Sequence, residues 1–226
     1  DLGVGVHIHV AEGPDDVDAP ARLAGLTTDD WLVIHGVGLP DDHGLRGTIV
    51  HNPRSNMNNA VGYARPARFA NRVALGTDGI GADLLEEFRL AFVALRASDV
   101  TATPETPWAW LAEGWRLFPE AADDRVRWSY PVADPWHLAY TPGVRPHEVW
   151  VDGRLAVADG RALLVDEAEI RAHAAEQATP WLPWQSYSML LSGSVQAHKT
   201  FREFSKMVQR AIEQVNAHHD SHQVHA

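Results

Sequence analysis

The sequence predicts an α/β protein whose strands form a parallel sheet that is buried on both faces. Short runs of Val, Ile and Leu alternate with helical stretches over the first hundred residues, and these runs are continuously apolar rather than alternately polar. Such strands are typical of parallel sheets that are covered by helices on both sides. Beyond residue 100 prolines and tryptophans become frequent, which indicates a packing or lid segment of a different character.

The apolar runs of the first part predict four strands, and the intervening segments predict helices. The expected strands are residues 4–10, 31–35, 48–51 and 73–76. The expected helices are residues 15–26, closed by Gly25, a short helix after Pro40, residues 65–71 and residues 83–96. The last is the clearest, because its apolar side chains recur with the helical period and so fall on one side.

The second part of the chain predicts a short helix and a hairpin. The helix is expected at residues 108–115. Residues 148–157 read as two strands joined by Asp152-Gly153, a dipeptide that strongly favours a tight hairpin turn. A third strand at 162–165, a helix at 167–177 and an amphipathic helix at 201–216 follow, and the chain ends in a histidine-rich stretch.

Composition narrows the class of function. The formal net charge is -11 and there is no basic run, which argues against nucleic acid or an anionic membrane as a partner. The chain has no cysteine, so any metal would be held by histidine and carboxylate side chains. It has neither a long apolar stretch nor a charged leader followed by an apolar run, so we expect a cytoplasmic protein that acts on a small molecule.

Polar residues stand at the end of each predicted strand. His9, His35, His51 and Asp78 occupy these positions, and Glu12 follows His9 by three residues. Because the carboxyl ends of parallel strands meet at one edge of a sheet, we expect these side chains to share a cleft. Imidazole and carboxylate ligands suit Zn²⁺ or Fe²⁺, so the pattern predicts one divalent metal ion, most readily Zn²⁺.

Some of these residues also have simpler interpretations. Asp78 could cap the helix expected from Asp83, since an acidic strand-to-helix turn is common. His35 taken alone could be a buried core histidine. His7 shares a strand face with His9, because residues two apart point the same way, but packing or support of a neighbouring ligand suits it better than ligation.

Four segments carry recognisable motifs: His9-Val10-Ala11-Glu12, Val33-Ile34-His35-Gly36-Val37-Gly38-Leu39, His51-Asn52-Pro53-Arg54-Ser55-Asn56-Met57 and Ala74-Leu75-Gly76-Thr77-Asp78-Gly79. Together they resemble the second half of the amidohydrolase superfamily. Within it they are most similar to the chlorohydrolase and aminohydrolase branch that includes SsnA-like proteins, guanine deaminase and the triazine hydrolases. The resemblance covers residues 4–96 and again 148–177, where a Val-Asp-Gly-Arg hairpin matches a small β-sandwich.

The resemblance implies a fold and a division of the chain. The fold would be the C-terminal half of a metal-dependent (β/α)₈ barrel, comprising strands five to eight, with a β-sandwich remnant and a C-terminal helix. Residues 1–145 would form the partial barrel with its Trp- and Pro-rich segment, and residues 146–178 the sandwich hairpin and helix. Residues 179–226 would be a C-terminal extension with a helix and a His-rich tail.

It also implies a reaction and a set of roles. Metal-bound hydroxide would attack a ring carbon of a small heterocycle and break a C–N (non-peptide) or C–Cl bond. The metal ligands would be His9, His35 and Asp78, and Glu12, His35 and Asp78 would be catalytic. The substrate pocket would include Asn52, Ser55 and Asn56, placed in a loop. His51 and His7 would lie next to the metal ligands and support them without binding the metal.

The chain departs from the family pattern in one important respect. The His-x-His of the first barrel strand, strands two to four and the N-terminal sandwich strands are not found, and a complete barrel takes about 250 residues. We therefore expect the site to be incomplete in this chain. It could be one half of a split enzyme that pairs with a chain supplying the missing strands, a homo-oligomer, or a non-catalytic scaffold that keeps a relic site.

Overall fold

The computed structural model describes residues 4–131 and 134–178. The chain divides into two compact units, residues 1–163 and 164–226. The expected helix at 201–216 and the histidine-rich stretch lie outside the described residues. Among the helices that the structure describes, none is long and apolar enough to cross a membrane.

The first unit contains a parallel sheet of four strands in sequence order. The strands are β1 (His7–Val10), β2 (Leu32–His35), β3 (Thr48–His51) and β4 (Val73–Leu75), and each pairs with the next along the chain. All four expected strands are thus confirmed, three of them with shorter bounds and β3 with the expected ones. Their Val, Ile and Leu side chains are mostly buried in β2, β3 and β4, as the sequence predicts for a sheet covered on both faces.

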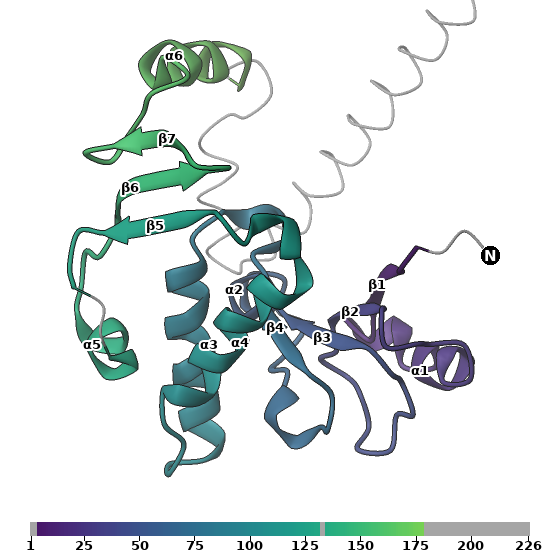
Figure 1. Cartoon of the computed structure of the whole chain (residues 1–226). Coiled ribbons are helices and arrows are strands. Elements are labelled where there is room, and N and C mark those ends of the chain that lie inside the picture. The colour runs from purple at the N-terminus through teal and green to yellow at the C-terminus, as the bar shows by residue number, and fades with distance from the viewer. Residues whose placement is uncertain (1–3, 132–133, 179–226) are drawn as a thin grey trace, which may run out of the picture. The chain divides into compact units, whose positions relative to one another are not determined.

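Helices pack against this sheet in two apolar clusters. One apolar cluster joins β4 to α3 (Leu84–Ser98), α4 (Glu105–Leu117) and α5 (Pro135–Tyr140), and Phe88 is fully buried in it. Figure 1 shows α3 and α4 side by side, with α4 next to β4. A second cluster packs α1 (Ala19–Leu23) and Leu39 against β1, β2 and β3.

A second sheet, antiparallel and also of four strands, follows in the same unit. It consists of β5 (Arg125–Trp128), β6 (Pro146–Val151), β7 (Arg154–Ala158) and β8 (Arg161–Ala162). The Asp152-Gly153 turn joins β6 to β7, with both residues in the left-handed region that such a turn requires. The predicted hairpin is confirmed. In the second unit, α6 (Glu167–Ala178) confirms the helix expected at 167–177.

Several expected elements differ in the structure. The helix expected at 15–26 is a 3-10 turn, Pro14–Asp16, followed by the short α1, because Pro20 can stand only in a helix's first turn. The helix expected after Pro40 does not form, and Gly44 there has φ +67°. The helix at 65–71 is a 3-10 turn, Pro66–Arg68, and the strand at 162–165 shrinks to β8.

The largest correction concerns the segment after β3. The sequence interpretation placed Asn52, Ser55 and Asn56 in a loop, whereas residues 53–58 form a helix, α2 (Pro53–Asn58). Pro53 stands at its first position, where its missing N–H costs nothing. The short elements β5 and α5 were not expected from the sequence at all.

Candidate metal centre

The parallel register brings the ends of the strands to one edge of the sheet. Val10 of β1 lies beside His35 of β2, and His51 of β3 lies beside Leu75 of β4. Asp78 follows three residues after the end of β4. The convergence that the sequence predicts at the carboxyl ends is therefore present.

The backbone at this edge is locally strained. Ala11, His35 and Asp78 have φ values of +51°, +70° and +51°, in the left-handed region that side chains other than glycine rarely adopt. Each such residue costs on the order of 1 kcal/mol and persists only where neighbouring contacts enforce it. Here the Ala11 amide donates to Asp16 Oδ2 at 2.7 Å and the Ala11 carbonyl accepts from Gly38 at 2.8 Å.

His35 lies at the centre of the cluster and is completely buried. Its Nδ1 is 2.8 Å from Asn56 Oδ1, which can only accept, so Nδ1 carries the proton and donates. Asn52 Nδ2 lies farther from the same nitrogen, at 3.5 Å. The other nitrogen, Nε2, is thereby left with a free lone pair, and it is buried without any hydrogen-bond partner.

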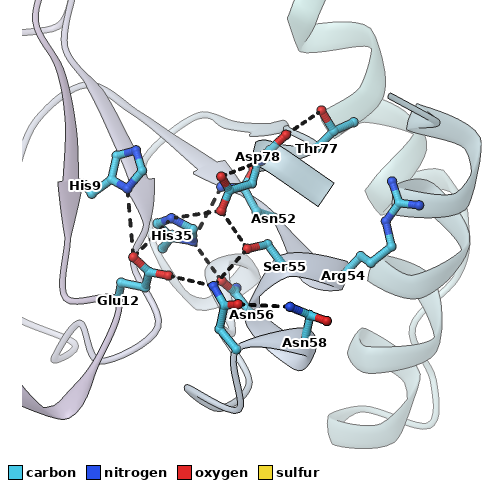
Figure 2. A network of polar contacts seen from close by, with 12 residues as sticks. His9, Glu12, His35, Asn52, Arg54, Ser55, Asn56, Asn58, Thr77 and Asp78 are labelled. Carbon is cyan, nitrogen blue, oxygen red and sulfur yellow. Dashed lines mark hydrogen bonds and ion pairs between the residues drawn. The ribbon is translucent and has the colours of Figure 1, made fainter. Parts of the chain in front are cut away.

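Two carboxylates and a second imidazole face that nitrogen. Glu12 Oε2 is 3.5 Å and Asp78 Oδ2 is 3.7 Å from His35 Nε2, and His9 Nδ1 is 3.8 Å from Glu12 Oε2. Figure 2 shows Glu12 between His9 and His35, with Asp78 on the other side of His35. The arrangement gathers four potential ligands from β1, the segment just after it, β2 and the segment after β4.

The donor set and its spacing fit a divalent cation. Ligand atoms of His9, Glu12 and His35 all lie within 4.8 Å of one another. Two ligands bound at 2.0–2.2 Å to one tetrahedral ion are about 3.4 Å apart, close to the separations of the two carboxylates from His35 Nε2. A buried imidazole lone pair facing carboxylates is also an arrangement that a cation would satisfy and a hydrogen bond does not.

Helix α2 and the residue just after it hydrogen-bond to the two carboxylates of the cluster. Ser55 Oγ donates to Asp78 Oδ2 at 2.6 Å, and Asn59, just past the helix, donates to Glu12 Oε1 at 3.3 Å. Together with the Gly79 amide, the Ser55 hydroxyl holds the pKa of Asp78 below its usual value, although partial burial opposes the shift. Asp78 is therefore ionised near neutral pH, in the form that binds metal.

The residues assigned to the substrate pocket have buried side chains. Asn52, Ser55 and Asn56 are at most 2 % exposed. Asn56 accepts from His35, Ser55 donates to Asp78, and Asn52 lies close to His35. These contacts support a role in orienting the site, and their predicted contact with substrate stays a prediction. Sequence reasoning missed Asn59 and Arg54, although Arg54 lies within the quoted motif.

The two supporting histidines differ in their surroundings. His7 is exposed on β1, and its ring stacks on that of His9 with the centroids 6.1 Å apart. His51 is buried, packs edge-on against Trp110 and lines a small cavity with side chains of α3. Burial, with a contribution from His35, lowers the pKa of His51 to about 4, so this ring is neutral.

The simpler interpretation of Asp78 as a helix cap is wrong. Asp83 caps α3, because its Oδ1 accepts from the amides of Leu85 and Glu86. The Asp78 carboxylate is instead directed at Ser55 and His35. It is thus free of a capping role and available to the cluster.

Curated relatives of the chain are deaminases. It is 30 % identical over 220 residues to a 5'-deoxyadenosine deaminase of Methanopyrus kandleri, covering 78 % of this chain and 51 % of the relative. It is 34 % identical over 127 residues to a 5-methylthioadenosine/S-adenosylhomocysteine deaminase of Desulfitobacterium hafniense, covering 46 % of this chain and 30 % of the relative. The chain spans about half the length of the former.

Solved structures of hydrolases are similar to this chain in fold. A zinc-bound adenosine deaminase of Xanthomonas campestris matches with a TM-score of 0.64 and 24 % identity, over 76 % of this chain and 49 % of that one. The resemblance to the amidohydrolase superfamily that the sequence motifs indicate is thereby confirmed. The E241Q mutant of atrazine chlorohydrolase TrzN from Arthrobacter aurescens, in complex with zinc and atraton, matches with a TM-score of 0.55 and 23 % identity, over 78 % of this chain and 49 % of that one. No protein-family model matches the chain.

Proposed function

We propose that this chain carries part of the active site of a metal-dependent amidohydrolase that acts on a C–N or C–Cl bond of a small heterocycle. The observation that supports this most is the buried, unpartnered Nε2 of His35, which faces Glu12 and Asp78 beside His9. The deaminase names of the relatives favour hydrolytic removal of an amino group from an adenosine-like base.

The donor set assigns a role to each residue. His9, His35 and Asp78 would hold one Zn²⁺ or Fe²⁺, since both ions accept imidazole and carboxylate. Such an ion supplies a water of lowered pKa at neutral pH. Asp78, ionised and fixed by Ser55, would take a proton from the attacking water. Glu12, which is partly exposed, would deliver a proton to the ring nitrogen.

The half-barrel is part of the proposal. The four parallel strands stand in sequence order, as in half of a (β/α)₈ barrel, and neither β1 nor β4 has a second strand partner among the described residues. Strand edges without a strand partner favour pairing with further strands. A partner chain that supplies those strands would complete the barrel, with residues 1–145 as the barrel part and 146–178 as the sandwich part.

Metal content tests the proposal. We expect about one Zn or Fe per wild-type chain by elemental analysis, and a loss of that metal in a His9→Ala/Asp78→Ala double variant. A His43→Asn variant is the matched control, because His43 is a buried histidine that packs on Phe69 away from the cluster. The histidines near the C terminus are common to every variant, so they cannot produce the difference.

The outcomes separate the proposed roles. Equal metal in wild type and double variant would contradict the site, and no metal in either would favour the non-catalytic alternative. With metal bound, ammonia release from adenosine-type nucleosides and chloride release from chlorinated triazines would define the bond that is cleaved. Glu12→Gln should then keep the metal and lose turnover, because it retains the shape of the side chain but cannot shuttle a proton.

A further inference from the structure

Arg54 makes an unusual set of contacts just behind the metal centre. Its backbone N–H donates to Glu87 Oε2 at 3.1 Å and its Nε donates to Oε1 of the same carboxylate at 2.9 Å. Glu87 lies on α3 and is completely buried. The start of α2 is therefore fastened to α3 through one carboxylate that accepts from both the main chain and the side chain of Arg54.

The far side of the guanidinium lies against the segment that carries Asp78. Gly81 has φ +151°, and a Cβ on it would come within 2.7 Å of Arg54 Nη2 and 3.1 Å of Cζ. The main chain at Gly81 thus packs directly against the guanidinium of Arg54. Nη2 is buried and has no hydrogen-bond partner, so its place is set by its attachment to Glu87 and by this packing.

The Asp78 segment is held at two points by consecutive residues. Ser55 binds the Asp78 carboxylate directly, and Arg54, one residue earlier on α2, supports Gly81 three residues later. Between these points the backbone is strained at Asp78 itself, with φ +51°. Strain of this kind persists only where the surroundings enforce it. Figure 2 shows the Arg54 guanidinium apart from the cluster of Glu12, His35 and Asp78, so it does not act as a ligand.

We propose that Arg54 is a positioning residue: clamped by Glu87, it supports the segment 78–81 and so keeps the Asp78 carboxylate directed at His35 Nε2. The link to metal affinity rests on the proposed metal site, whereas the effect on the segment does not. Lysine could neutralise Glu87 but has no planar fork to carry the glycine main chain. An Arg54→Lys variant therefore distinguishes the effect of the positive charge at position 54 from the effect of the planar guanidinium.

The first test needs no metal. In the metal-free protein, Arg54→Met should speed amide hydrogen exchange in residues 77–82. Arg89→Met is the matched control, because Arg89 also lies on this side of the fold, on α3, but donates to the carbonyls of Leu138 and Thr141 instead. Exchange in 77–82 that is as slow in Arg54→Met as in wild type and in Arg89→Met would overturn the proposal.

The second test connects the segment to the metal. We expect Arg54→Met to weaken Zn²⁺ binding about tenfold, the usual size of effect for groups that support a ligand. Arg54→Lys should recover most of the thermal stability but not the affinity, and Arg89→Met should lose stability with affinity unchanged. Wild-type affinity in a folded Arg54→Met would overturn the positioning role. Failure of the wild type itself to bind Zn²⁺ would contradict the proposed function and leave the exchange result to decide on Arg54.

A double-variant cycle tests the contact directly. Gly81→Ala places a Cβ against the guanidinium, so it should accelerate exchange in 77–82 more in the wild-type background than in Arg54→Met. Equal effects in both backgrounds would mean that the left-handed backbone of Gly81 alone accounts for the change, which contradicts the clamp.

Discussion

The two sheets of the first unit differ sharply in burial. All three residues of β4 and three of the four in β2 are buried, whereas none of the residues in β5, β6, β7 or β8 is. Both sheets have the same number of strands, and both contain Val and Leu side chains. The difference indicates that burial, rather than the number or composition of the strands, decides which sheet can hold polar side chains in a defined geometry.

Polar side chains show the same contrast. Among the described residues, the buried side-chain atoms without a partner belong to His35, His51, Arg54 and Asn56, all on β2, β3 or α2. In the antiparallel sheet the main polar contact is an exposed pair, Arg127 with Glu148. Unsatisfied groups are costly in a low dielectric, so their concentration on one side of the molecule points to function there.

The largest expected effect comes from matched leucines in the two sheets. Leu75→Ala in β4 should lower the free energy of unfolding by about 3 kcal/mol, because it leaves a cavity in the cluster around Phe88. Leu155→Ala in β7, a partly exposed position, should cost about 1 kcal/mol. Urea denaturation of both variants measures the two values. Similar losses of unfolding free energy in the two variants would contradict the difference in burial between the two sheets.

Two Arg–Glu pairs give the next contrast: Glu87 accepts from Nε and the backbone N–H of Arg54, whereas Glu148 accepts from Nε and Nη2 of Arg127. Arg54→Met leaves the buried Glu87 carboxylate without its cation, which should cost about 3 kcal/mol of unfolding free energy. Arg127→Met removes the equivalent contact from an exposed pair, and its urea midpoint should stay close to that of wild type. A large loss in Arg127→Met would show that the antiparallel sheet depends on this pair.

Stability should fall with acid partly through His51. Burial lowers the pKa of His51 from 6.5 to about 4, so the neutral ring stabilises the fold above pH 6.5 and this contribution is lost as the pH falls toward 4. The loss should reach about 2 kcal/mol by pH 5. In metal-free protein, His51→Asn should flatten the dependence of unfolding free energy on pH over this range, while His147→Asn in β6 serves as the strand-histidine control. An unchanged slope in His51→Asn would contradict the assignment.

The smallest expected effect concerns two helix caps. Asp83 accepts two amides at the start of α3, and Asp134 accepts one at the start of α5. We expect Asp83→Ala to cost about 1 kcal/mol and Asp134→Ala about 0.5 kcal/mol. Thermal melts followed by circular dichroism would rank the two, and the reverse order would place more stability in α5 than its single capping bond suggests.

Much of the parallel sheet could be predicted from the sequence because its strands are continuous apolar runs. The same runs made it possible to predict that His35 and Asp78 meet, since parallel strand ends converge. Helix α2 could not be predicted from its composition. Its residues are largely polar, and its contacts to Asp78 and His35 come from distant parts of the chain. Tertiary contacts, rather than intrinsic propensity, stabilise this helix.

Other elements carried weak signals. Residues 125–128 alternate polar and apolar, as β5 requires, but four residues are too few to distinguish a strand from a loop. Asp134 and Pro135 mark the start of α5 in the usual way, as a cap followed by proline. The left-handed backbone conformation of His35, with φ +70°, could not be predicted from the sequence, because a histidine does not by itself indicate a positive φ.

The order of the strands in the parallel sheet has a consequence for synthesis. Each strand pairs with the one made just before it, so β1 and β2 can bring His9, Glu12 and His35 together before Asp78 has left the ribosome. At about 5–20 residues per second, that interval lasts on the order of seconds. Asp78, three residues beyond β4, is thus the last of the four to arrive, and its arrival would complete the proposed set of cation ligands on the nascent chain.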